Sequence, residues 1–212
     1  MAIKVLSVES MPFAENSYVV WRDGTSEAIV IDPGFEPDAI LQELAKRNLT
    51  LVAIVNTHGH VDHIAGNGAM KEAFPAAPII IGTGDASMLT NADLNLSGGY
   101  GFNIISPPAE QLVNDNETIT LAGIEMLVRE VPGHSAGHVV FYIAGERPML
   151  LGGDVLFSGS IGRTDFPGGS LDTLLDGIRK KLWILPPETI VYPGHGGPTT
   201  IGDEKRTNPF LK

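Results

Sequence analysis

The sequence has 212 residues, of which 43% are hydrophobic, and no linker or break in composition divides it, so we expect a single domain over residues 1–212 with a sizeable core. Its 25 acidic and 14 basic residues give a net charge of −11 spread along the chain, which argues against a nucleic-acid backbone as partner. The chain contains no cysteine, which excludes disulfides, a thiolate nucleophile and metal sites with thiolate ligands.

The first half of the chain predicts strands that alternate with helices. Alternating or continuously apolar segments between turn signals predict strands at residues 3–8, 17–21, 28–31, 51–56 and 79–81. One helix is expected over residues 37–48 and another over residues 64–73. Residues 90–110 are rich in Gly, Asn and Pro and carry Tyr100 and Phe102. This loop is longer than a plain connection requires, and a loop of this length could cover a site.

The second half repeats this alternation. Strands are predicted at residues 117–121, 125–131, 139–144, 149–152 and 189–192. A helix begins at Ser170, and its apolar stripe consists of Leu171, Leu174, Leu175, Ile178 and Leu182. Strands clustered in each half, with helices between them, predict an α/β protein in which two sheets pack face to face under outer helices, with the strand order left open. No apolar run approaches the roughly 18 residues that cross a bilayer, and the N-terminus lacks a signal sequence, so we expect a cytoplasmic protein without a membrane partner.

All six histidines lie in short segments that follow predicted strands. The densest segment reads Thr-His-Gly-His-Val-Asp-His and contains His58, His60, Asp62 and His63. The other histidines each lie beside a glycine in a turn-like setting: His134, His138 and His195. A packed core has no use for such a cluster, whereas neutral imidazole suits Zn, Fe, Ni and Cu, and a carboxylate can complete or bridge such sites. Ordinary surface or hydrogen-bonded core roles stay open for some of them, above all for His138.

The spacing within residues 57–63 differs from that of the helical HExxH metal motif, and Gly59 would be unfavourable inside a helix. We therefore interpret the cluster as a loop. In an irregular segment, side chains at positions i, i+2, i+4 and i+5 can converge on two adjacent centres. The sequence thus predicts a binuclear site with nitrogen and oxygen ligands.

Five motifs, taken in order, resemble those of the metallo-β-lactamase superfamily, and they span nearly the whole chain: residues 30–34, 57–63, 132–138, 152–154 and 193–196. The resemblance implies an αββα sandwich, with two mixed sheets face to face and helices outside. It also implies two divalent metal ions, with Zn as the first choice and Fe or Mn as options. One ion is expected on His58, His60 and His134, the other on Asp62, His63 and His195, with Asp154 bridging both.

Two carboxylates receive further roles from this resemblance. A water bridging two ions roughly 3.5–4 Å apart would supply a hydroxide nucleophile at neutral pH, and Asp62 is expected to orient it as a catalytic residue. Asp32 matches a family position near the metal-binding loop, where it would hold a ligand or the loop by hydrogen bonds. A plain turn at the end of a strand would explain Asp32 almost as well.

Within the superfamily, the chain is most similar to glyoxalase II, the hydroxyacylglutathione hydrolase, and its short bacterial relatives. These carry Asp at the bridging position and a basic residue nine positions later, which here is Arg163. Two features depart from full-length glyoxalase II: Asp165 replaces an aromatic residue, and only 17 residues follow His195, so the helical extension that helps to bind glutathione is not expected. The resemblance implies hydrolysis of an acyl-thioester of the S-lactoylglutathione type.

Positive charge near the site predicts an anionic small-molecule thioester as substrate. Arg163, Lys205 and Arg206 stand out on an acidic chain, and the guanidinium of Arg163 could hold a carboxylate bidentately. Tyr100 is expected to line the same binding site. For Lys205 a solvated surface role is an equal alternative. Both a monomer and a homodimer stay open.

Three enzymatic alternatives and one non-enzymatic alternative remain. Residues 133–137 satisfy the GxSxG nucleophile-elbow pattern around Ser135, but the segment that follows is predicted as a strand instead of the helix that this elbow requires. Persulfide dioxygenases share the fold and the string Gly-Arg-Thr-Asp-Phe, and use one iron. A lactonase would keep the same seven ligands. A metal that merely organises a regulatory or scaffold domain would also explain the ligands.

Overall fold

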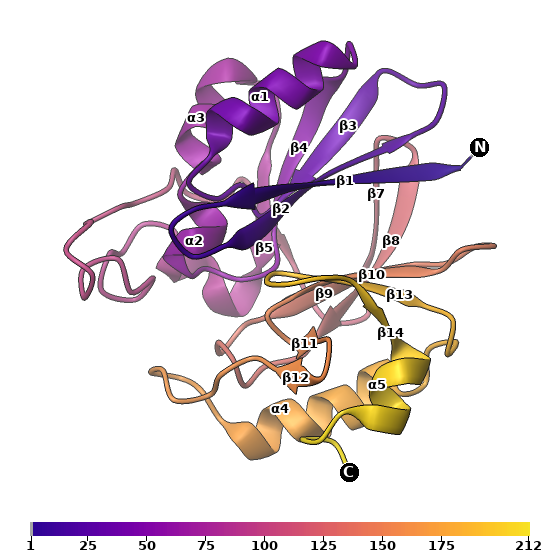
Figure 1. The fold of residues 1–212 in the computed structure, drawn as a ribbon. Helices are drawn as coiled ribbons and strands as arrows, with labels where there is room; N and C mark the ends of the chain where they lie inside the picture. The colour runs from indigo at the N-terminus through magenta and orange to yellow at the C-terminus, as the bar shows by residue number, and fades with distance from the viewer. Residues whose placement is uncertain (1) are drawn as a thin grey trace.

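Two six-stranded sheets face each other in the computed structural model, which describes residues 2–212, and helices cover the outer face of each sheet (Figure 1). The first sheet contains, in spatial order, β1 (Ile3–Ser10), β2 (Glu15–Arg22), β3 (Glu27–Ile31), β4 (Thr50–Asn56), β5 (Ile79–Gly82) and β6 (Gln111–Val113). The second contains β14 (Thr199–Thr200), β13 (Ile190–Pro193), β10 (Met149–Gly153), β9 (Val139–Ile143), β8 (Ile124–Glu130) and β7 (Thr118–Leu121). Both sheets are mixed, because neighbours from β3 to β6 and the pair β10 and β13 are parallel while the other pairs are antiparallel.

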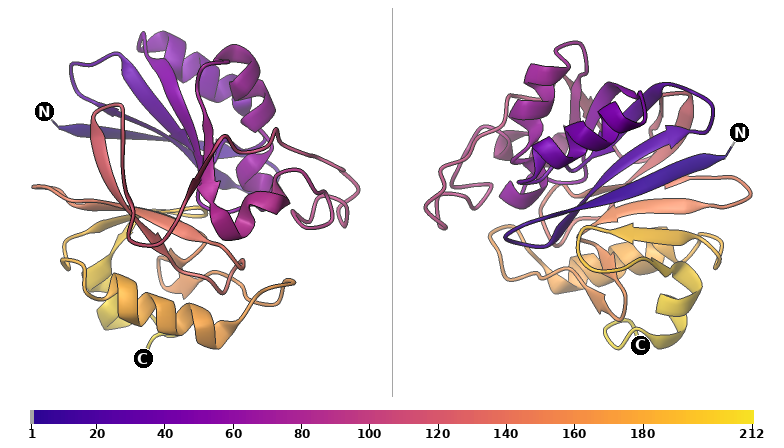
Figure 2. Two further views of the ribbon diagram at one scale, coloured as in Figure 1. Left: turned by 180° about the vertical axis from the view of Figure 1, so that it is seen from behind. Right: turned by 45° about the horizontal axis from the view of Figure 1, so that its top comes forward.

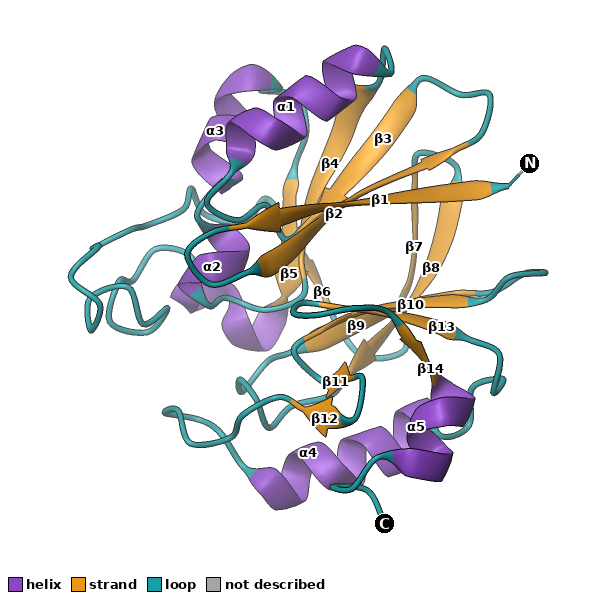
Figure 3. Ribbon diagram, viewed as in Figure 1, coloured by secondary structure: helices purple, strands orange, loops and turns teal. Residues whose placement is uncertain are grey.

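The helices form the two outer layers, as the colouring by secondary structure shows (Figure 3). The first half of the chain supplies α1 (Pro37–Lys46), α2 (Val61–Ile64), α3 (Asn67–Ala73) and the 3-10 helix η1 (Thr83–Met88). The second half supplies α4 (Leu171–Gly177), which continues as the π-helix η2 (Ile178–Leu182), then α5 (Ile201–Thr207), and a hairpin of β11 (Leu156–Phe157) and β12 (Ser160–Ile161). The predicted αββα sandwich is confirmed.

Three apolar layers hold the sandwich together, because successive strand residues point to opposite faces of their sheet. In β3, Ile31 faces the layer between the sheets and Val30 packs in the layer beneath α1 and α3. In β10, Leu151 faces the same inter-sheet layer and Leu150 packs in the layer beneath α4. Central strands are therefore buried on both faces, which is why the sequence shows them as continuous apolar runs.

The carboxyl ends of β3, β4, β10 and β13 meet at one edge of the sandwich, where parallel strands usually present ligands. Two backbone hydrogen bonds join the sheets there: the N–H of Val139 donates to the carbonyl of Thr57 (2.8 Å), and the N–H of Asn16 donates to the carbonyl of Gly194 (2.7 Å). The long loop between η1 and β6 extends past this edge (Figure 2). Within residues 2–212, no helix has the length and apolar character needed to span a bilayer.

The second predicted helix differs from the structure. Gly66 separates α2 from α3, and it lies so close to the preceding turn that a Cβ atom there would be 2.6 Å from the carbonyl oxygen of Gly34. Helix α2 also begins at Val61, so the interpretation of the histidine cluster as a loop is wrong for Asp62 and His63. Sequence patterns did not predict β6, β11, β12, β14, η1 or α5, which are too short to show a clear hydrophobic period.

Candidate metal centre

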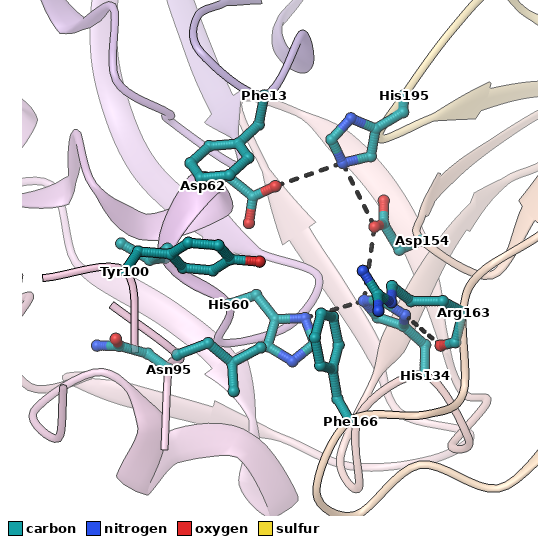
Figure 4. A pocket seen from close by; sticks show the side chains of 12 residues that line it. Phe13, His60, Asp62, Asn95, Tyr100, His134, Asp154, Arg163, Phe166 and His195 are labelled. Atoms are coloured by element: carbon teal, nitrogen blue, oxygen red, sulfur yellow. Dashed lines mark hydrogen bonds and ion pairs between the residues drawn. The ribbon is translucent and has the colours of Figure 1, made fainter. Parts of the chain in front are cut away.

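Seven side chains from four segments converge at this edge of the sandwich, and Figure 4 shows five of them around a pocket. Two groups of potential ligands bring their ligating atoms within 4.8 Å of one another. The inner group consists of His58, His60 and His134. The outer group consists of Asp62, His63 and His195. Each of the two sets that the sequence resemblance implies therefore lies close together, and their assignment to two ions stays a prediction.

The carboxylate of Asp154 lies between the two groups. One oxygen, Oδ1, is 3.5 Å from Nε2 of His63 in the outer group. The other, Oδ2, is 3.5 Å from Nε2 of His134 in the inner group and 3.4 Å from Nε2 of His195 in the outer group. A single side chain is thus positioned to contact both centres.

Four of these histidines use one ring nitrogen to contact the protein. Nδ1 of His58 lies 3.1 Å from Oγ1 of Thr57, and Nδ1 of His63 lies 3.0 Å from Oδ2 of Asp32. Nδ1 of His134 lies 2.8 Å from the carbonyl oxygen of Arg163, and Nδ1 of His195 lies 3.3 Å from that of Ala14. This arrangement holds each ring through Nδ1, so Nε2 is the nitrogen that would bind a metal. Among the described residues, the buried atoms His58 Nε2, His63 Nε2 and Asp154 Oδ1 have no hydrogen-bond partner. Buried polar atoms rarely lack partners, so these atoms fit metal ions.

Electrostatics keep two histidines of the inner group neutral. Burial, followed by neighbouring histidines, lowers the pKa of His58 well below its ordinary value. Burial and the nearby His134 lower the pKa of His60 to about 3, and Nδ1 of His60 lies 2.9 Å from Nε2 of His134. Neutral imidazole is the form that binds metal. His58 and His60 are therefore ready to coordinate an ion without releasing protons near neutral pH.

The outer group attracts positive charge. Burial opposes protonation of His63, but Asp62 and Asp154 outweigh it and raise the pKa of His63 to about 9. Burial also opposes protonation of His195, yet hydrogen bonds to the same two carboxylates raise its pKa to about 11. The protons on His63 and His195 are stabilised by the negative charge of Asp62 and Asp154. Bound divalent ions would neutralise the same charge.

Asp32 follows β3 and holds the start of the metal-binding segment. Its carboxylate accepts hydrogen bonds from the backbone N–H of Thr57 (2.7 Å) and from Oγ1 of Thr57 (2.6 Å), and it contacts Nδ1 of His63 (3.0 Å). Although Asp32, His58 and His63 lie close enough to form a third cluster, these hydrogen bonds occupy the carboxylate. Asp32 is therefore placed to orient a ligand and is not left free to bind an ion itself.

Asp85 holds together the two segments that carry the inner histidines. Asp85 of η1, which belongs to none of the sequence motifs, accepts hydrogen bonds from the N–H of Gly59 (3.3 Å), Oγ of Ser135 (2.5 Å) and the N–H of Gly137 (2.6 Å). It thereby joins the two histidine-bearing segments of the inner group. Because Ser135 donates to Asp85 and is followed by strand β9, the structure rejects the nucleophile-elbow alternative.

His138 also has a position that the sequence left open. Burial lowers the pKa of His138 well below its ordinary value, so the ring is neutral. Its Nε2 accepts a hydrogen bond from the backbone N–H of Asp154 (3.0 Å), and its ring stacks on that of His58 with centroids 4.7 Å apart. His138 thus supports two potential ligands from behind.

A clamp from β2 holds the segment that carries His195. The side-chain amide of Asn16 donates to the carbonyls of Pro193 (3.1 Å) and Gly196 (2.8 Å), and the hydroxyl of Tyr18 donates to Pro193 (2.6 Å). These side chains belong to the first sheet, whereas His195 follows a strand of the second sheet. Sequence reasoning missed this clamp, because it joins residues about 175 positions apart.

The pocket in front of the ligands contains only part of the predicted substrate-binding set. Tyr100 and Arg163 line it, but the guanidinium of Arg163 donates two hydrogen bonds of 2.7 Å to the carboxylate of Asp165 and lies 4.0 Å from the ring centre of Phe166. The prediction is wrong for Lys205 and Arg206, which lie on α5 and do not line the pocket. The amine of Lys205 donates to the carbonyl of Trp183 (2.7 Å), and Arg206 forms an ion pair with Asp203.

Comparison with known proteins decides the family. The model of the metallo-β-lactamase superfamily matches residues 11–195. The chain belongs to this superfamily. A probable metallo-hydrolase of Streptococcus pyogenes is 39% identical, over 93% of this chain and 85% of its own length. The hydroxyacylglutathione hydrolase GloC of Haemophilus influenzae is 36% identical, over 100% of this chain and 98% of its own.

Solved structures of this superfamily match the whole architecture. The B3 metallo-β-lactamase BLEG-1 has a TM-score of 0.93 and 38% identity, with each chain covered completely. TTHA1623 in a di-iron-bound form has a TM-score of 0.86 and 38% identity, over 98% of this chain and 100% of its own. ETHE1 from Myxococcus xanthus has a TM-score of 0.78 and 29% identity, over 99% of this chain and 84% of its own. The chain is therefore a metallo-hydrolase of this superfamily, with histidine and aspartate groups suited to metal.

Proposed function

We propose that this protein hydrolyses an acyl-thioester with two bound divalent ions. The observation that carries the proposal is the pair of ligand groups joined by Asp154 at the floor of an open pocket. Similarity to GloC over the full chain favours a thioester of a small thiol as the substrate class. Nitrogen and oxygen donors favour Zn, and the di-iron form of TTHA1623 makes Fe the next choice.

His58, His60 and His134 would hold one ion, Asp62, His63 and His195 the other, and Asp154 both. When bound, the ions would polarise the thioester carbonyl and lower the pKa of water. The carboxylate of Asp62 is 16% exposed and faces the pocket, and its Oδ2 lies 3.4 Å from Nε2 of His195. Burial raises its pKa, but the nearby His63 outweighs burial and lowers it, so Asp62 is ionised at neutral pH.

Asp62 can therefore accept a proton on its second carboxylate oxygen when water attacks the carbonyl carbon. The C–S bond then breaks, and the proton passes to the departing sulfur. The overall reaction consumes one water and gives one carboxylic acid and one thiol. The rigid contacts of His63 with Asp32 and of His134 with the carbonyl of Arg163 keep the ligands in place while charge moves.

The test compares reactions on purified protein loaded with Zn, Fe or Mn, with metal content measured for each form. A panel of one thioester, one lactone, one β-lactam and one persulfide separates the activities of the superfamily. We expect thiol release from the thioester to be the fastest reaction, with no consumption of oxygen. Oxygen uptake with the persulfide by a form holding a single iron would instead establish the dioxygenase alternative. Ring opening of the lactone or β-lactam at a higher rate would reassign the substrate class.

A further inference from the structure

The wall of the pocket that faces the ligands is aromatic. Phe13, Tyr100 and Phe166 line it (Figure 4). Val61 and Leu96 add to this lining. The ring of Phe166 lies 5.4 Å from that of His60, so this wall reaches the inner ligand group directly. An apolar surface therefore begins where the reacting carbonyl must lie.

A second row of rings supports this wall from outside. Phe35 lies 5.8 Å from Phe13, and Phe102 lies 5.7 Å from Phe35 and 6.4 Å from Tyr100. Phe13 and Tyr100 contact each other edge to face at 5.5 Å. Tyr100 and Phe102 remain 51% and 46% exposed. Exposed aromatic residues that gather beside a site indicate a binding surface, because scattered surface residues would not form such a cluster.

The loop that carries Tyr100 is fixed before any substrate arrives. The fully buried side chain of Asn95 donates to the carbonyls of Met88 (3.1 Å) and Ile104 (2.9 Å). Oγ of the buried Ser97 accepts from the N–H of Ile104 (3.0 Å). The carbonyl of Asn95 accepts from the N–H of Val61 at the start of α2 (3.0 Å). The aromatic wall is therefore tied to the helix that carries Asp62 and His63, and a substrate would meet a preformed surface.

The charges of the pocket do not favour an anionic group on this wall. Apart from the histidines, Arg163 is the one cationic side chain among the described lining residues, and its Nε and one terminal nitrogen donate hydrogen bonds to Asp165. A shallower hollow continues outward along Leu96, Tyr100 and Phe166, where the only charged lining residue described is Asp93. A carboxylate on this path would meet an acidic residue and no free cation.

We propose that this wall binds an apolar acyl chain, so that the preferred substrates are thioesters of medium-chain or aryl-substituted acids. The inference rests on the proposed thioester hydrolysis and names the group that flanks the reacting carbonyl. Phe13, Tyr100 and Phe166 are then specificity-determining residues. The small polar lactoyl group and acyl groups that bear a carboxylate make poorer use of this surface.

The test uses acetyl, butyryl, hexanoyl, phenylacetyl and succinyl thioesters of one small neutral thiol. Since the chain has no cysteine, a chromogenic disulfide reports the released thiol without background from the protein. Full burial of one methylene would raise kcat/KM about fourfold. An open wall buries each methylene only in part, so we expect about twofold per methylene. We therefore expect hexanoyl to exceed acetyl by roughly tenfold or more, and succinyl to fall below butyryl.

Variants connect this trend to the wall. Tyr100→Ala should reduce the ratio of hexanoyl to acetyl kcat/KM several-fold without changing metal content, whereas Tyr100→Phe should preserve the ratio. Phe210→Ala is the matched control, because Phe210 is also 51% exposed but does not line the pocket. An unchanged ratio in Tyr100→Ala, or a fastest reaction with succinyl thioester, would overturn the proposal. So would a preference that appears only when the apolar chain is placed on the thiol.

A binding measurement separates this inference from the proposed function. Phenylacetate and acetate, the product acids, are titrated into metal-loaded protein and followed by ligand-observed NMR. We expect phenylacetate to bind at least several-fold more tightly than acetate, and this preference to be lost in Tyr100→Ala. If no thioester is cleaved but the preference holds, the reaction is wrong and the apolar subsite stands. Equal binding of both acids would reject the subsite whatever the reaction.

Discussion

The inner and outer ligand groups are built in different ways. The inner histidines are nearly inaccessible, with exposures of 0%, 5% and 2% for His58, His60 and His134, and Asp85 joins their two segments directly. In the outer group, the side chain of His195 is 29% exposed and that of Asp62 is 16% exposed. The outer group is also assembled across the sandwich, because the clamp of Asn16 and Tyr18 on the first sheet holds the segment of His195 on the second.

This difference predicts unequal metal sites. A preorganised and buried set of three imidazoles binds an ion with little rearrangement. The outer group must release the protons that Asp62 and Asp154 stabilise on His63 and His195, and the segment of His195 depends on a contact between sheets. Titration with one divalent ion should therefore give two steps, with the inner group filled first.

The largest effect should follow Asp154→Ala, which removes the one side chain shared by both groups. We expect both binding steps to weaken and turnover to fall by more than a hundredfold, since loss of a residue that merely supports a ligand already costs about 10- to 100-fold. Metal analysis after dialysis measures the first effect and thioester hydrolysis the second. Retention of two tightly bound ions would show that Asp154 does not connect the groups.

Asp85→Asn should weaken the inner group selectively. The carboxylate of Asp85 accepts hydrogen bonds from three donors. In asparagine an NH₂ group replaces one carboxylate oxygen, so at least one of these donors loses its acceptor. Affinity for the first ion should fall about 10- to 100-fold, and the free energy of unfolding of the metal-free protein by about 1–3 kcal/mol. Competition with a chelator and denaturant unfolding measure these effects. An unchanged first step, with only the second weakened, would reverse the assignment.

Asn16→Ala should act on the outer group. It removes both side-chain hydrogen bonds to the segment of His195, and we expect affinity for the second ion to fall about tenfold while the first step is unchanged. Tyr18→Phe removes a single hydrogen bond to Pro193 and should give a smaller change in the same direction. Equal losses in both steps would mean that the clamp supports the fold as a whole.

The sequence predicts well which histidines and aspartates lie together, because each follows a strong local signal. His58, His60 and His63 come directly after a continuous apolar strand, and the glycine-flanked His134 and His195 also follow strands. Parallel strands bring such segments to one edge, so local signals suffice to predict where they meet. The same reasoning gives the two sheets and the main helices.

The supporting contacts could not be predicted in this way. Asp85 and Asn16 act through backbone groups of distant segments, and nothing in their own surroundings marks them. Lys205 and Arg206 were expected near the site because they follow His195 closely in sequence. The chain instead passes through β14 into α5, and both residues lie on that helix. Proximity in sequence does not fix the direction in which a chain leaves the site.

Substitution of Arg163, whose carbonyl contacts the inner histidine His134, should have the smallest effect on turnover and metal binding. A free guanidinium that held a substrate carboxylate would contribute about 1.5–3 kcal/mol, which is roughly ten- to a hundredfold in KM. The pair of hydrogen bonds to Asp165 occupies this guanidinium, whose side chain is 55% exposed, so we expect Arg163→Ala to change KM for a succinyl thioester by only about two- to fivefold. Metal content should not change, because His134 contacts the backbone carbonyl of Arg163, which alanine keeps.

Asp165→Ala is the informative partner of this variant. It frees the guanidinium of Arg163 beside the pocket, so it should lower KM for the succinyl thioester by about two- to fivefold and leave the acetyl thioester nearly unaffected. The double variant of Arg163 and Asp165 should lose this gain, because the gain requires the free cation. A tenfold or larger rise in KM for the succinyl thioester in Arg163→Ala alone would instead show that Arg163 leaves Asp165 to bind the substrate carboxylate.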